Sequence, residues 1–65
     1  MGDFEEAFKI KAQQLLGILR AQSLPAEALK EVRGLFDQAT VVYTQGKTED
    51  ALVLVVQAIQ RAKRG

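Results

Sequence analysis

Side chains that commonly catalyse reactions or bind metals are scarce in this chain of 65 residues. Histidine and cysteine are absent. The chain therefore lacks the commonest general base, the strongest nucleophile and the usual transition-metal ligands. Five of the eight acidic side chains gather in two groups, Asp3-Phe4-Glu5-Glu6 and Glu49-Asp50. Each group stands where a helix is expected to begin, and attraction to the helix dipole explains carboxylates at that position. We therefore predict no catalytic, cofactor or metal site, and we expect that the protein is not an enzyme.

One short motif is similar to part of a nucleotide-binding loop. Gly46-Lys47-Thr48 matches the end of a P-loop, but the first glycine of that loop should stand where this chain has Val41. No strand is predicted before the motif either, so we do not expect it to bind phosphate. Nine basic and eight acidic residues give a formal net charge of +1. Without a basic surface we expect no nucleic-acid partner.

Length and composition indicate one small helical domain over residues 1–65. Hydrophobic residues make up 48% of the chain, which is ample for a globular core and too high for a disordered segment. No apolar run approaches the ~18 residues of a membrane span, and no signal-peptide pattern is present. We expect no membrane insertion and a cytoplasmic location.

The most apolar run is Ala51–Ile59, and the other segments are expected to cover it. Its valines favour a strand, but Thr48 can cap a helix and basic residues follow at Arg61-Ala62-Lys63-Arg64. Apolar residues also recur at steps of three and four. The pattern predicts a helix over 48–64 with an apolar arc wider than one neighbouring helix covers.

Two further amphipathic helices are predicted over residues 3–22 and 25–45. Pro25 suits the first position of a helix, and Gly46 suits the left-handed residue that ends one. Both connections are short, so adjacent helices must run antiparallel, and the fold class is all-α, an antiparallel three-helix bundle. The third helix is expected to pack against both others. The predicted core is Phe8, Leu15, Leu19, Leu29, Val32, Phe36, Leu52, Val55 and Ile59.

The second hairpin, about residues 32–65, resembles a tetratricopeptide-repeat unit. That pattern places glycine in the turn and then alanine, a bulky residue and alanine, and here these are Gly46, Ala51, Val55 and Ala58. The chain departs from it at Gln38, where an apolar residue is usual. The resemblance implies a helical module that binds a peptide or a partner protein.

These observations predict a non-catalytic protein-interaction module that binds a partner helix or peptide through exposed apolar surface. The alternative is a self-associating bundle, in which a second copy covers the same surface as a homodimer. In both cases we expect the contact on the outer face of the third helix, because Val53 lies outside its apolar arc and Leu54 at its edge. The predicted partner-contact residues are Val41, Val53, Leu54, Val56 and Gln57.

Overall fold

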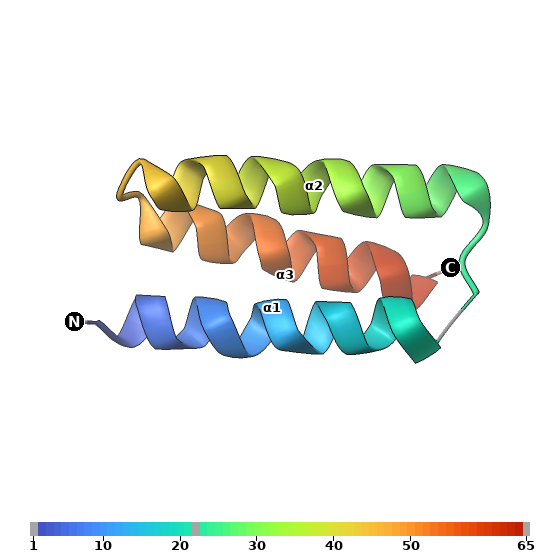
Figure 1. Ribbon diagram of the computed structural model, residues 1–65, viewed down its shortest axis with the longest axis horizontal. Helices are drawn as coiled ribbons and strands as arrows, with labels where there is room; N and C mark the ends of the chain where they lie inside the picture. Colours follow the sequence, from blue (N-terminus) through green and yellow to red (C-terminus); the bar gives the residue numbers. More distant parts are fainter. Residues whose placement is uncertain (1, 22, 65) are drawn as a thin grey trace.

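The computed structural model describes residues 2–21 and 23–64, which form three helices (Figure 1). Their bounds are Asp3–Ala21 for α1, Ala26–Thr44 for α2 and Thr48–Arg64 for α3. Helices α1 and α3 run in the same direction and α2 runs against them. The predicted all-α three-helix bundle is confirmed, with Gln22 outside the described residues. Among the described residues, no helix is both long and apolar enough to cross a membrane.

The two turns follow from one proline and one glycine. Pro25 has φ −58° and ψ 154°, and its carbonyl accepts the amide of Leu29 at 2.9 Å, so that helix α2 begins directly after it. Gly46 has φ +87°, and its amide donates to the carbonyl of Tyr43 at 3.0 Å. A left-handed glycine at that position closes the carbonyl end of a helix, as the sequence predicted.

Helix α3 spans the predicted residues, but its capping residue lies one position earlier than expected. The amide of Ala51 donates to the carbonyl of Lys47 at 3.0 Å, which makes Lys47 the capping residue and Thr48 the first helical residue. The first-turn carboxylates, Glu49 and Asp50, still lie next to the positive end of the helix dipole.

The core is built mainly from small side chains around α3. Helix α3 packs against both other helices, as predicted. Its buried face carries three alanines with Val55 and Ile59, and α2 adds two more alanines with Val32. Small residues let helix backbones approach closely, so they fill the centre where the prediction had favoured larger side chains. The buried alanines are Ala28, Ala39, Ala51, Ala58 and Ala62.

The predicted core is confirmed in part. The buried members are Phe8, Leu15, Val32, Val55 and Ile59. The members that are only half-buried are Leu19, Leu29, Phe36 and Leu52. For Leu19 and Phe36 the reason is that the bundle is open on the side they face.

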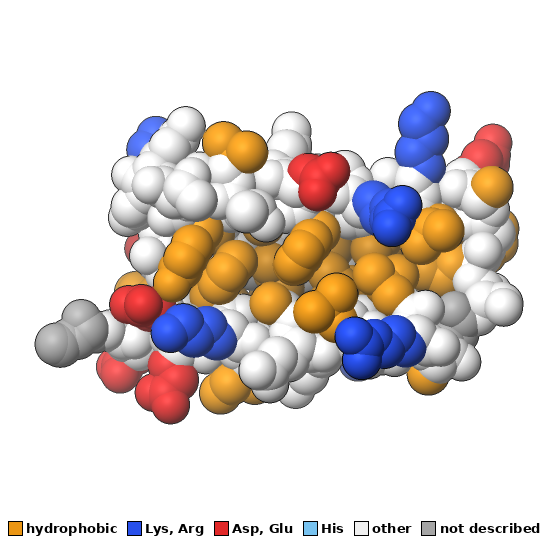
Figure 2. All heavy atoms as spheres, viewed as in Figure 1, with side chains coloured by type: hydrophobic (Ala, Val, Ile, Leu, Met, Phe, Trp, Pro, Cys, Tyr) orange, Lys and Arg blue, Asp and Glu red, His pale blue; other side chains and the backbone are white. Residues whose placement is uncertain are grey.

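The backbones of helices α1 and α2 stay apart, although some of their side chains meet. Over their described residues, no Cα atom of α1 lies within 8 Å of a Cα atom of α2. In Figure 1, α3 lies behind the gap between their ribbons, and Figure 2 shows side chains filling that gap with a hydrophobic stripe. We name this stripe the α1–α2 seam, and its residues are Phe8, Leu16, Leu19, Phe36 and Tyr43.

Candidate interaction surfaces

The residues of the predicted contact surface differ in exposure. Val41 on α2 and Val53 on α3 are exposed, at 55% and 50%. Gln57 is also exposed, whereas Leu54 and Val56 are half-buried. Leu54 packs against the core cluster, so it contributes to the fold as well as to the surface.

Two of these five residues share a groove, and the other three are neighbours on α3 at steps of three and four. Val41 and Leu54, with Val42, line an apolar groove of about 490 Å³ between α2 and α3. On a helix of about 100° per residue, Val56 stands about 160° around α3 from Leu54, with Val53 between them. The predicted contact residues of α3 therefore extend from one flank of the helix across its outer face to the other flank.

A more enclosed hollow lies in the α1–α2 seam. It has a volume of about 350 Å³ and is lined by Leu16, Leu19 and Phe36, with Arg33 and Asp37 at its border. Leu16 is 43% exposed, and Leu19 and Phe36 are half-buried. The seam thus keeps large apolar side chains in contact with solvent on the face opposite α3.

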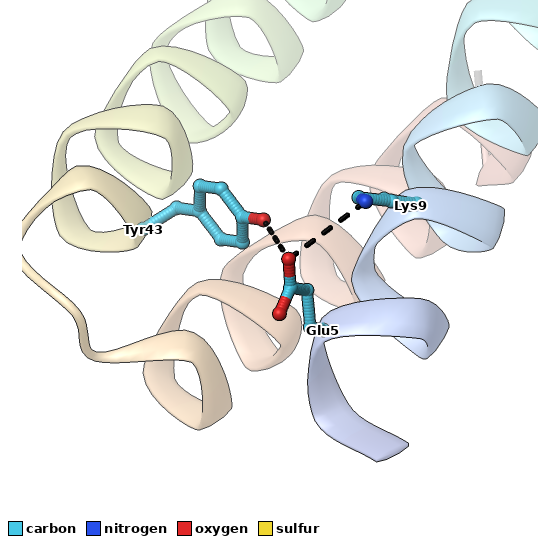
Figure 3. A network of polar contacts seen from close by, with 3 residues as sticks. All are labelled: Glu5, Lys9 and Tyr43. Carbon is cyan, nitrogen blue, oxygen red and sulfur yellow. Dashed lines mark hydrogen bonds and ion pairs between the residues drawn. The ribbon is translucent and has the colours of Figure 1, made fainter. Parts of the chain in front are cut away.

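Aromatic rings close one end of the seam. Phe8 and Tyr43 stack across the gap, with ring centroids 4.5 Å apart and planes 10° from parallel. The Tyr43 hydroxyl donates to Oε2 of Glu5 at 3.2 Å, and the same oxygen lies 3.7 Å from Nζ of Lys9 (Figure 3). At this end the Glu5 carboxylate is hydrogen-bonded, the Lys9 ammonium is paired with it, and the two aromatic rings fill the gap between the helices.

The other end of the seam carries arginines on both walls. Arg33 of α2 lines the hollow. Arg20 of α1 follows Leu16 by four residues, which places it one turn further along the same face of the helix. Neither arginine forms an ion pair within the described part of the chain, where the ion pairs are Lys9–Glu5 and Arg61–Glu31.

Two further hollows, of about 510 and 450 Å³, lie on α2 and between α1 and α3, and they are lined mostly by small or polar side chains. The described residues contain no group of three or more carboxylates that could hold a metal ion. Every buried side-chain nitrogen or oxygen among them has a hydrogen-bond partner. Comparison with protein-family models, curated proteins and solved structures finds no match to this chain. The candidate functional features are therefore the two apolar surfaces.

Proposed function

We propose that this chain is a non-catalytic helical interaction module, and that it binds one helix of a partner protein in the α1–α2 seam. The observation that carries the proposal is the gap between the backbones of α1 and α2: over their described residues both helices pack on α3, yet no Cα atoms of the two approach within 8 Å. The gap is bridged by the stack of Phe8 and Tyr43, and the other side chains of the seam, Leu16, Leu19 and Phe36, remain partly or largely exposed. An apolar strip between two helices matches the mode in which a groove receives an amphipathic helix.

The dimensions suit a helix. Each wall of the seam is a helix of 19 residues, or about 28 Å at 1.5 Å per residue. Packed helices lie about 8–10 Å apart, so a helix laid opposite α3 would contact α1 and α2 together. It would complete a four-helix arrangement, in which each helix has two neighbours. The expected ligand is an amphipathic helix of about five turns.

The seam is a better candidate than the groove beside Val41. Its hollow is more enclosed, and it contains aromatic side chains, which are enriched at the centres of protein interfaces. The groove of Val41 and Leu54 lies between α2 and α3, which already pack on each other. A ligand there would rest on the outside of that helix pair and would not fill a gap between two helices. It stays the second surface to be tested.

A synthetic peptide tests the proposal directly. The probe is a fluorescein-labelled amphipathic helix of about five turns, with leucines at helical spacing and glutamine beside them. Leu16→Glu places a charge in the seam, and Val53→Glu places the same charge on the outer face of α3, at a side chain of similar exposure. We expect fluorescence anisotropy to show binding to the parent and Val53→Glu chains and much weaker binding to Leu16→Glu.

Circular dichroism on both variants checks that the helical content is retained, as expected for substitutions at partly exposed positions. Loss of binding in Val53→Glu with binding kept in Leu16→Glu would place the contact on the outer face of α3. A peptide that binds none of the three folded proteins would contradict the proposed function.

A further inference from the structure

We infer that the partner helix carries acidic side chains beside its apolar stripe, where they meet Arg20 and Arg33 at the open end of the seam. This inference rests on the proposed function and adds the charge of the ligand. A leucine stripe alone would fit the hydrophobic part of the seam. The two arginines determine which side chains of the partner helix are favoured beside its leucine stripe.

The arginines occupy opposite walls of the same end. Arg33 borders the hollow from α2, while Arg20 extends from α1 one turn beyond Leu16. Lys and Arg side chains are visible on both borders of the hydrophobic stripe in Figure 2. A helix lying in the seam would thus have a guanidinium on each side. Guanidinium groups bind carboxylates with two parallel hydrogen bonds, which makes acidic residues their best-matched partners.

The protein's own carboxylates leave this end positive. Asp37 is the carboxylate among the side chains that line the hollow, and it is not ion-paired with Arg33 within 4 Å, although the two are four residues apart. Asp37 offsets Arg33 in the lining of the hollow, and Arg20 on the α1 wall adds a positive charge that no further carboxylate of that lining offsets. At the closed end, Glu5 is bonded to Tyr43 and lies beside Lys9, and Glu6 lies next to them, so that end has no excess of positive charge. The excess positive charge therefore lies at the end of the seam that contains the hollow, away from the Phe8–Tyr43 stack.

A second copy of the chain fits the seam less well. If two seams met in parallel, the arginines of one copy would face those of the other, and like charges would repel. If they met antiparallel, the arginines would face the end that holds Glu5, whose carboxylate already accepts the Tyr43 hydroxyl and lies beside Lys9. A partner with its own free carboxylates satisfies both arginines without breaking that network.

Three peptides that share one leucine stripe test the inference, with glutamate, glutamine or lysine as the flanking residues. We expect the glutamate peptide to bind the parent chain most tightly and the lysine peptide most weakly, with a difference of about tenfold from two partly exposed ion pairs. The preference should shrink as salt is added, since exposed charges are screened. The double variant Arg20→Glu/Arg33→Glu should reverse the order.

The matched control is Lys47→Glu/Arg64→Glu, which changes the net charge equally at exposed positions away from the hollow. It should keep the preference for the glutamate peptide. If this control loses the preference, or if Arg20→Glu/Arg33→Glu keeps it, the effect comes from overall charge and the inference is wrong.

The remaining outcomes separate the inference from the proposed function. Equal binding of the three peptides overturns the inference and leaves helix binding in the seam intact. Failure of all three overturns both. A light-scattering mass of twice 7.2 kDa that Leu16→Glu returns to 7.2 kDa would show that a second copy occupies the seam, which also overturns the inference.

Discussion

The rings of Phe8 on α1 and Tyr43 on α2 stack with their centroids 4.5 Å apart and their planes 10° from parallel. Because no Cα atoms of these two described helices approach within 8 Å, the stack spans a gap that the backbones leave open. An aromatic pair contributes about 0.5–1.5 kcal/mol beyond the area that it buries. The stack therefore sets the spacing of the two walls and closes one end of the seam.

The first prediction separates the contribution of the Phe8–Tyr43 ring stack to stability from that of the Tyr43 hydroxyl. Tyr43→Leu removes the ring but keeps an apolar side chain, and it should lower the free energy of unfolding by about 1–2 kcal/mol. Tyr43→Phe keeps the ring and loses only the bond to Glu5, so it should cost about 0.5 kcal/mol at this partly exposed site. Urea unfolding measures both. Equal losses would mean that the hydroxyl, not the stack, holds the helices together.

A second prediction compares neighbouring leucines. Leu15 is fully buried, whereas Leu16 is 43% exposed in the seam. Leu15→Ala should lower the free energy of unfolding by about 2–5 kcal/mol through the cavity it leaves. Leu16→Ala should cost about 1 kcal/mol or less, because the side chain keeps much of its contact with water in the folded state. Thermal melts of the two variants give the comparison, and similar losses would contradict the assigned register of α1.

The sequence predicted the helices well because their ends depend on local chemistry. Pro25 and Gly46 determine the turns through their own backbone preferences, and the bounds agree to within one residue wherever the structure describes them. Periodicity also identified the apolar face of each helix. The residues fully buried on those faces, such as Ala51 and Ala58, were less predictable, since close helix approach depends on tertiary packing.

The candidate site was the hardest part to predict. A helical wheel shows which side of a helix is apolar but not which two helices leave a gap between them. Leu54, expected at the edge of the apolar arc of α3, is half-buried and packs against the core cluster. Leu16 is in neither the predicted core nor the predicted contact surface, yet it lines the hollow of the seam. The available signal was the apolar half of α1, which is wider than its one contact with α3 requires.

The glycines give a third prediction. Gly46 has φ +87°, so Gly46→Ala should lower the free energy of unfolding by about 1 kcal/mol or more. A Cβ at Gly34 would meet no atom within 4 Å. Gly34→Ala should therefore raise the free energy of unfolding by about 0.5–1 kcal/mol, because alanine has the higher helix propensity. Urea midpoints measure the two shifts. Destabilisation by Gly34→Ala would reveal a close contact at that helix face.

A fourth prediction concerns the ion pair that links α2 to α3. Nε of Arg61 donates to Oε1 of Glu31 at 2.8 Å, with side-chain exposures of 24% and 58%. Solvent screening limits such a pair, and a double-mutant cycle with Arg61→Gln and Glu31→Gln should give a coupling of about 0.5 kcal/mol. The coupling should decrease in high salt. A coupling that does not respond to salt would indicate packing by the arginine stem rather than charge.

The most direct test of the central claim is to map the contact by amide chemical shifts. The protein is labelled with ¹⁵N and titrated with the glutamate-flanked leucine peptide. The account predicts that the largest shifts follow the seam, at Leu16, Leu19, Arg20, Arg33 and Phe36, while the amides of Val53 and Gln57 stay near their free positions. Shifts that gather instead at Val41, Val53 and Gln57, with the seam unchanged, would contradict it.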